Sequence, residues 1–529
     1  MADITRRSFV TGALTAAAAM APTAAIAQPA VNDETAWDKE CDVLVIGYGG
    51  AGAASAITAH DAEAEVLIIE KMPFGGGNTA CSGGGVLCSD DKDSAYTYIT
   101  RLFDFSRSEM DESLVRVFAD MSVENVDWLC SLKPDTQMSV YGGAGYKQVE
   151  GADAQKKYGV DVVDAVTNPD NPTTGHSGAS LFELYDYAVN ERGIEVMLST
   201  PAKRLLTNAA GEVVGAKATD EDGSEINIKA RKAVILTTGG YEYDQQTLQN
   251  FVKGSPIYAL GAVGNTGDGI RMAQAVGAGL WHMTGVSCGL GVKMEDYPNA
   301  YHVAKLKPSM IWVNKLGKRF VNEKGVETHA GLLAVDHFDA QTLDYNEIPF
   351  WVVFDETARL KGRAVNCGFW SEDNLEEIES GLIVKADTVA ELADKIGVPA
   401  ETLTATVDKW NEDIVAGEDT VFGRPIANVK NVAYNALNDN DISSAPLETA
   451  PYYALQIYPA LINTQGGPRR NDKAQILDAF GEPIPRLYSS GEMGSLWGII
   501  YQGAGNNAES LVFGRIAGEN AAKLENWDA

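Results

Sequence analysis

The fold is decided by the stretch DVLVIGYGGAG at residues 42–52 and by the apolar run VLII at residues 66–69. Each apolar run predicts a buried parallel strand, and the chain between them predicts a helix from about Ala53 to His60. The glycines have the spacing that permits a tight turn, close approach of a pyrophosphate and tight packing of a helix on a strand. These glycines are Gly47, Gly49 and Gly52.

Glu70 follows the second run, about 20 residues beyond the glycines, where an acid accepts hydrogen bonds from a ribose. An acid at this position also disfavours the additional phosphate of NADP. A glycine turn with a purely structural role is the alternative interpretation. Because strand, glycines, helix, second strand and acid all occur in register, the stretch predicts a dinucleotide-binding βαβ unit.

The N-terminal segment has the pattern of an export signal. TRRSFV at residues 5–10 contains a twin arginine and precedes an alanine-rich stretch that ends near Ala27. An uncleaved membrane anchor is the alternative, but the apolar run is shorter than the roughly 20 residues that span a bilayer. We expect residues 1–27 to be a Tat signal peptide. The mature protein would then lie in the periplasm or on the outer face of the bacterial cytoplasmic membrane.

The composition limits the classes of partner. The chain has 529 residues, of which 45% are hydrophobic, so we expect two domains or one large domain with an insertion. A formal net charge of -31 argues against nucleic acid as a partner. That charge favours solubility, or a surface that docks a basic electron carrier.

The six cysteines form no CxxC or CxxCH pattern, so no haem, zinc or iron–sulfur site is predicted. We expect most of them to be buried and structural. The chain is therefore not predicted to contain a metal centre that delivers electrons, and any electrons for a redox reaction must come from a carrier outside this chain.

Five glycine-rich segments follow one another in a characteristic order. The first, GGGNTACSGGG, comes directly after the βαβ unit, and two later ones end apolar runs that predict buried strands. The last opens the C-terminal helix. These segments occupy residues 75–85, 233–240, 264–269, 487–492 and 505–515.

With these motifs the chain resembles the FAD-dependent family of fumarate reductase and succinate dehydrogenase flavoproteins, of the FAD-binding 2 type, which includes urocanate reductase and 3-ketosteroid dehydrogenases. The resemblance implies an α/β fold, with a Rossmann-like FAD-binding domain at residues 37–285 and 446–529. An α+β capping domain would be inserted at residues 286–445. A helix near residues 401–411, with Leu403, Val407 and Trp410 on one face, is predicted in that insertion.

The resemblance also implies which residues bind FAD. The loop at residues 78–84 lacks the histidine that covalent members carry, so we expect non-covalent FAD. The positive end of the last helix would face the N1/O2 side of the flavin. The implied cofactor residues are Gly47, Gly49, Gly50, Gly52, Glu70, Gly76, Asn78, Thr79, Ser82, Gly83, Gly84, Ala202, Thr238, Gly240, Asp268, Gly491, Glu492, Asn507, Ser510 and Leu511.

The chain lacks the histidines and arginines that bind the substrate and donate the proton in the fumarate reductase pattern. Two histidines and two arginines of that pattern correspond to Gly289, Asn463, Glu327 and Gly503. A fumarate site is therefore not expected. Arg469 and Arg470 are the nearest other arginines, although a solvent-exposed turn explains them equally well.

The segment Tyr501-Gln502-Gly503-Ala504-Gly505 is similar to the ketosteroid dehydrogenase pattern. That resemblance implies that the Tyr501 hydroxyl and the Gly505 N–H bind a substrate carbonyl oxygen, as an oxyanion hole does. A merely packed tyrosine is the alternative.

The acid–base group is Glu327, if burial raises its pKa, or His329, which titrates near neutrality in its ordinary state. Either residue can equally lie on the cap surface. Tyr141 and Tyr146 are weaker candidates that would face the substrate, and His282 is interpreted as a core histidine.

We therefore expect an exported FAD-dependent oxidoreductase that reduces a C=C bond conjugated to a carbonyl, with hydride passing from flavin N5 to the β-carbon. The substrate would be a small unsaturated carbonyl compound less anionic than fumarate. The electrons would come from a cytochrome or a quinol-linked donor of anaerobic respiration. One alternative is a 3-ketosteroid-type dehydrogenase running the reverse reaction. Another is a flavin electron-transfer subunit without a substrate of its own.

Overall fold

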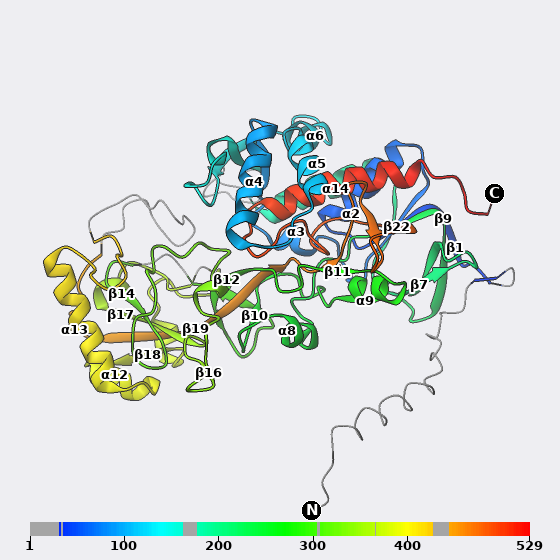
Figure 1. The fold of residues 1–529 in the computed structure, drawn as a ribbon. Helices are drawn as coiled ribbons and strands as arrows, with labels where there is room; N and C mark the ends of the chain where they lie inside the picture. Colours follow the sequence, from blue (N-terminus) through cyan, green and yellow to red (C-terminus); the bar gives the residue numbers. More distant parts are fainter. Residues whose placement is uncertain are drawn as a thin grey trace, which may run out of the picture.

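The computed structural model describes residues 31–32, 35–161, 177–303, 307–365, 367–426 and 444–528. It consists of two lobes, each built around one large sheet (Figure 1). The predicted Tat signal lies outside the described residues. Within the ranges given, no helix has the length and apolar character needed to cross a membrane.

The first lobe contains an eight-stranded sheet with a parallel centre in the order β22-β9-β1-β2-β6. The two apolar runs of the βαβ unit are neighbouring parallel strands, with Val43 opposite Val66, which confirms their prediction. The parallel strands are β1 (Lys39–Ile46), β2 (Val66–Ile69), β6 (Glu195–Met197), β9 (Glu225–Leu236) and β22 (Pro483–Ser489). The antiparallel strands are β7 (Ala202–Thr207), β8 (Val213–Thr219) and β21 (Gln475–Leu477).

Helices α2 (Gly50–Asp61) and α14 (Gly505–Ala522) lie against each other in the first lobe (Figure 1). Two glycines of α14 permit this approach. A Cβ atom at Gly514 would lie 2.8 Å from the Ala54 Cβ, and one at Gly518 would lie 2.4 Å from the Ser55 carbonyl oxygen. The remaining helices are α3 (Gly77–Cys81), α4 (Lys92–Ser106), α5 (Glu112–Ser122), α6 (Asn125–Ser131), α7 (Gly178–Glu191) and α9 (Asp268–Ala275).

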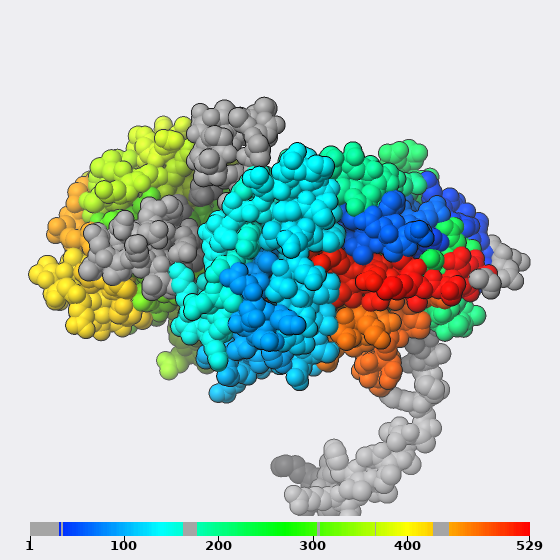
Figure 2. Space-filling model, turned by 90° about the horizontal axis from the view of Figure 1, so that it is seen from above, coloured from blue at the N-terminus to red at the C-terminus, as the bar shows by residue number. Residues whose placement is uncertain are grey.

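A small three-stranded sheet in the order β3-β5-β4 follows the glycine-rich loop after β2. Its strands are β3 (Val86–Ser89), β4 (Met138–Gly143) and β5 (Gln155–Val160). Figure 2 shows the cyan part of the chain, which includes β4 and α5, at the junction of the two lobes. This sheet therefore brings residues of the first lobe close to the second.

The second lobe contains a seven-stranded sheet in the order β13-β12-β19-β17-β14, with β10 and β18 also paired to β19. Helix α13 (Ala400–Ala416) buries Leu403, Val407 and Trp410, as predicted. The strands are β10 (Tyr258–Ala259), β12 (Val286–Lys293), β13 (Ala300–His302), β14 (Met310–Val313), β17 (Phe350–Asp355), β18 (Ile383–Ala386) and β19 (Tyr452–Thr464). The other helices are α8 (Gln245–Phe251), α10 (Glu356–Arg359), α11 (Leu375–Glu379) and α12 (Val389–Ile396).

Strand β19 differs from the predicted domain boundary at residue 446. The prediction assigned residues 446–529 to the returning FAD-binding part, but β19 pairs along its length with β17, β18, β10 and β12 of the second sheet. The chain rejoins the first sheet only at β21 and β22. An apolar strand pattern indicates burial but does not identify the partner strand, which explains the difference.

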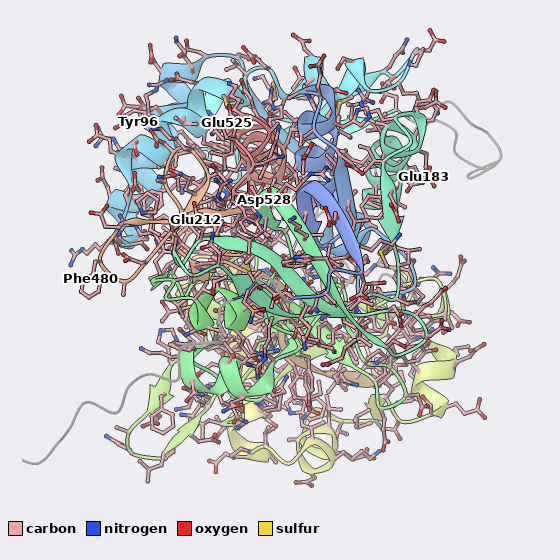
Figure 3. The ribbon with its side chains drawn as sticks, turned by 90° about the vertical axis from the view of Figure 1, so that its right-hand side faces the viewer. Tyr96, Glu183, Glu212, Phe480, Glu525 and Asp528 are labelled. Carbon is pink, nitrogen blue, oxygen red and sulfur yellow. The ribbon has the colours of Figure 1, made fainter. Side chains whose placement is uncertain are left out.

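The C-terminal end of the chain is attached to the first sheet. The Asp528 carboxylate lies 2.5 Å from the Nζ atom of Lys229 on β9. Arg486 donates to Glu212 at 3.0 Å and to the Glu525 carbonyl oxygen at 2.8 Å. Figure 3 labels Glu212, Glu525 and Asp528 at this edge of the lobe.

Candidate active site

A cavity of about 970 Å³ extends from the carboxyl ends of the parallel strands to the second lobe. This is near the upper end of the roughly 300–1,000 Å³ range of ligand sites. The glycine-rich motifs line one end of the cavity, and His302, Glu327, His329 and Tyr501 line the other. The carboxyl ends of parallel strands are where α/β sheets bind their ligands.

The glycines of the first turn have two different roles. Gly47 has φ +110°, and a Cβ atom there would lie 2.5 Å from the Thr237 carbonyl oxygen. A Cβ at Gly52 would lie 2.0 Å from the Gly47 carbonyl oxygen, so both positions require glycine for packing. Gly49 lines the cavity, and a Cβ atom added there would have the Gly76 carbonyl oxygen, at 3.5 Å, as its nearest neighbour. The turn therefore leaves open space at Gly49 for close approach of a ligand.

Glu70 lies in the cavity wall with both carboxylate oxygens oriented by the backbone. Its Oε2 accepts from the Tyr48 N–H and its Oε1 from the Met72 N–H, each at 2.8 Å. Each oxygen keeps a further lone pair that can accept from a ribose hydroxyl. Asp268, in the same wall, is paired with Lys71 at 2.6 Å.

The structure divides the twenty predicted cofactor residues into two groups. Those that line the cavity are Gly47, Gly49, Gly50, Glu70, Asn78, Thr79, Ser82, Gly83, Ala202, Thr238, Asp268, Glu492, Asn507 and Ser510. Those that lie behind its wall are Gly52, Gly76, Gly84, Gly240, Gly491 and Leu511. The second group shapes the backbone rather than facing the cavity. A Cβ at Gly240, for example, would lie 2.0 Å from the Thr464 Oγ1.

Two buried carboxyl groups meet at Asn78. Its Nδ2 donates to Glu242 Oε1 and to Glu492 Oε2, each at 2.7 Å. Burial raises the pKa of both carboxyl groups, and the charge of Glu242 raises that of Glu492 further. The pair therefore retains a proton more readily than free carboxyl groups do. Glu242 was not predicted from the sequence, although this acid lies two residues after Gly240 of a predicted strand-to-glycine turn.

The last helix directs its N-terminal turn at the cavity, where Asn506, Asn507 and Ser510 line the wall. This orientation places the positive end of the helix dipole there. The Gly505 N–H, however, donates to the Gln502 carbonyl oxygen at 2.9 Å, and Gly505 does not line the cavity. The predicted oxyanion role of Gly505 is therefore wrong, because its donor is used inside the turn.

Tyr501 is buried and its side chain reaches the cavity. The Asn506 N–H donates to its hydroxyl oxygen at 3.0 Å, and its ring centroid lies 5.1 Å from that of His329. Burial raises the pKa of Tyr501, so the hydroxyl stays protonated. With the oxygen engaged by Asn506, the hydroxyl proton can be donated to a ligand.

Glu327 and His329 form a hydrogen-bonded pair in the cavity wall. The His329 N–H donates to Glu327 Oε2 at 2.7 Å, and its Nδ1 lies 2.9 Å from Oε1. Burial alone would raise the pKa of Glu327, but the charge of His329, these hydrogen bonds and Lys157 outweigh burial and lower it. Glu327 is therefore a carboxylate, which corrects the prediction that burial makes it an acid.

Sequence reasoning missed two basic side chains at this end of the cavity, His302 and Lys157. A Cβ at Gly289 would lie 2.2 Å from the Cε1 of His302, so the glycine there makes room for this ring. A Cβ at Gly503 would lie 2.5 Å from the Cε1 of His329 and 3.1 Å from the Nζ of Lys157. Burial and the charge of His329 lower the pKa of His302 to about 4, so it is neutral at pH 7.

Arg470 is not in a solvent-exposed turn. It is fully buried and forms an ion pair with Glu509, while Arg469 pairs with Glu109 at 2.8 Å. Neither arginine lines the cavity. The prediction of an exposed turn is thus wrong for Arg470, because the carboxylate of Glu509 on α14 neutralises it in the core.

The weaker candidates have different locations. Tyr141 lines the cavity, whereas Tyr146 does not. His282 is held between the carbonyl oxygens of Ser495 and Glu109, at 3.0 and 2.9 Å. Of the six cysteines, Cys41, Cys88 and Cys288 are buried, and Cys81 is exposed.

The fold and cavity define a dinucleotide-binding flavoprotein with a capping lobe. The family described as "FAD binding domain" matches residues 42–508, and the chain belongs to this family. The acid at Glu70, the open space at Gly49 and the helix N-terminus fit FAD.

Relatives from both the reductase and the dehydrogenase branches are similar to the chain. A probable fumarate reductase of Shewanella frigidimarina is 30% identical over 497 residues, which are 91% of this chain and 74% of that protein. A urocanate reductase of Eggerthella lenta is 29% identical, over 92% of this chain and 75% of its own length.

The structure of 3-ketosteroid Δ1-dehydrogenase from Sterolibacterium denitrificans, in complex with 1,4-androstadiene-3,17-dione, superimposes with a TM-score of 0.77. The identity is 22%, covering 92% of this chain and 99% of that one, and it supports the shared fold. From its family and from these similar enzymes, we conclude that this chain is an FAD-dependent oxidoreductase that acts on CH–CH groups.

Proposed function

We propose that the protein reduces a C=C bond conjugated to a carbonyl group. The observation that carries this proposal is the Tyr501 hydroxyl, which is buried at the cavity and accepts from the Asn506 N–H. Its own proton is then directed to the substrate carbonyl oxygen, where negative charge develops as the β-carbon receives a hydride. FAD, when bound, supplies that hydride.

His329 donates the proton that the α-carbon needs to complete the reduction. Its Nδ1 faces Glu327, which leaves Nε2 for the substrate. The Glu327 carboxylate stabilises the charged imidazole and fixes its orientation. The product thus gains one hydride and one proton, and an external carrier must return two electrons to the enzyme.

We propose that FAD is dissociable, since Asn78 occupies the loop where covalent members carry histidine. We further propose that the protein is exported through its twin-arginine segment and that a cytochrome or a quinol-linked donor reduces its flavin. The names of the Shewanella and Eggerthella relatives favour the reducing direction.

Two alternatives make different predictions. A dehydrogenase would transfer electrons from a saturated ketone to an acceptor, and the likeness to a ketosteroid dehydrogenase favours it. An electron-transfer subunit needs no side-chain donor at the substrate end, so Tyr501 and His329 argue against it.

The test uses the mature protein, with its flavin reduced anaerobically by dithionite. We would follow flavin absorbance while adding fumarate, urocanate, cinnamate and steroid enones separately. Rapid reoxidation by an enone or enoate is expected. If no compound reoxidises the flavin and saturated ketones reduce it, the protein is a dehydrogenase and the proposal is wrong. Acid precipitation that leaves all flavin in solution would support dissociable FAD.

A further inference from the structure

Lys157 brings a positive charge to the substrate end of the cavity. It lies on β5, and its stem passes Gly142 of β4, where an added Cβ would lie 3.5 Å from the Lys157 Cδ. Its Nζ reaches within 3.1 Å of the position that a Cβ on Gly503 would occupy. Because Gly503 also adjoins His329, the ammonium group lies beside the groups that we assign to catalysis.

Within the described part of the chain, the Lys157 ammonium has no ion pair or hydrogen bond. Burial lowers the pKa of Lys157, although the charge of Glu327 opposes this effect. The neighbouring Lys156 is different, because it donates to the Asp153 carbonyl oxygen at 2.7 Å and faces Asp90 at 3.5 Å. A partly buried ammonium group that makes no direct ion pair or hydrogen bond is costly, and an anionic ligand in contact with it would offset that cost.

The charges around this end of the cavity favour an anion. Lys147 and Lys157 both line the cavity, and among the described residues the carboxylate of Glu327, which interacts with Lys157, is already engaged by His329. This local excess of positive charge contrasts with the net charge of -31 on the whole chain. A small anion with an adjacent C=C bond would therefore be attracted to the place where the reaction occurs.

We infer that the substrate is an enoate, a 2-unsaturated carboxylate, and that Lys157 binds its carboxylate group. The inference rests on the proposed function and specifies its substrate class. Addition of hydride to the β-carbon of an enoate places a second negative charge on the carboxylate oxygens. Tyr501 and Lys157 would stabilise that charge together, whereas an uncharged enone would leave the ammonium without a partner.

The experiment compares an acid with uncharged compounds of the same skeleton. Cinnamate, methyl cinnamate and 4-phenylbut-3-en-2-one are each added to the dithionite-reduced holoenzyme, and the kcat/KM values for flavin reoxidation are compared. Wild-type protein is expected to prefer cinnamate. Lys157→Met should lower kcat/KM for cinnamate by about tenfold to hundredfold, mainly by raising KM. The kcat/KM values for the ester and the ketone should change by less than about threefold.

Two controls keep the result interpretable. Lys156→Met removes the neighbouring lysine on the same strand and should leave all three substrates unaffected, while Lys157→Arg should restore part of the cinnamate reaction. If Lys157→Met lacks FAD, titration of oxidised wild-type holoenzyme with 3-phenylpropanoate and its methyl ester decides the question through the flavin absorbance. Tighter binding of the acid would then support the inference, and tighter binding of the ester would overturn it.

The outcomes separate the two claims. Faster reduction of the ketone than of cinnamate, or equal losses on all three compounds in Lys157→Met, would overturn the enoate inference and leave the proposed reductase intact. No reoxidation by any of the three compounds would count against the proposed function itself, and the inference would fail with it.

Discussion

The Nδ1 atom of His329 lies 2.9 Å from the Oε1 atom of Glu327, and the main-chain N–H of His329 donates to the other oxygen of the same carboxylate at 2.7 Å. The two residues are only two positions apart, so a single turn of the chain fixes both contacts. This arrangement gives the imidazole one nitrogen for orientation and one for chemistry.

His329→Ala should lower the rate of substrate reduction by about 10²-fold to 10⁴-fold, because the α-carbon loses its proton donor. Added imidazole should restore part of the rate, which a purely structural role would not permit. Flavin reoxidation by enone or enoate measures both effects. The exposed His337→Ala is the control and should behave as wild type. An unaffected rate in His329→Ala would assign the proton to another group.

Tyr501→Phe should lower kcat by about 10²-fold to 10³-fold while FAD content stays unchanged, because the hydroxyl that stabilises the developing oxyanion is lost. Tyr146→Phe is the matched control, since Tyr146 lies near the cavity without lining it. The reoxidation assay and the ratio of flavin to protein absorbance check the prediction. Equal effects of the two substitutions would show that Tyr501 only packs.

Gly503→Ala should displace His329, because the new Cβ would lie 2.5 Å from its Cε1. We expect a loss of at least about tenfold in kcat with FAD still bound, since misplacement of a catalytic group by about 1 Å is costly. Gly368→Ala adds a methyl group where no atom lies within 4 Å and should change nothing. Full activity in Gly503→Ala would mean that His329 can move without consequence.

Glu242→Gln should reduce the sensitivity of the protein to alkaline pH. The folded pKa values of Glu242 and Glu492 are raised above 4.5, so the folded state binds more protons than the unfolded state. This contribution to stability is present at low pH and is lost as pH rises through the folded pKa values. The side-chain amide introduced by Glu242→Gln would donate a hydrogen bond to Glu492 at every pH. The variant should therefore lose less stability than wild type as pH rises.

Thermal unfolding from about pH 5 to about pH 9, with and without FAD, measures the effect of Glu242→Gln. Glu519→Gln is the control, because Glu519 is exposed and pairs with Lys523 at the surface. Parallel curves for wild type and Glu242→Gln would show that the two carboxyl groups do not share a proton in the folded protein.

Local sequence patterns were sufficient to predict the βαβ unit, the order of the glycine-rich turns and the helix with Leu403, Val407 and Trp410. Each of these depends on local constraints: hydrophobic periodicity, the steric requirement for glycine at Gly47, and an acid at the tip of a strand. Such constraints act between residues close in the chain, so they can be recognised without knowing the tertiary structure.

The chemistry of the substrate end depends on contacts between segments that are distant in the sequence. His302 and Lys157 reach it from strands far apart in the sequence, and glycines at positions 289 and 503 make room for these two side chains. The ionisation of Glu327 depends on the balance between its burial and the charges around it, and the Gly505 N–H is used by a turn. These properties arise from packing between distant segments, which local sequence patterns do not encode.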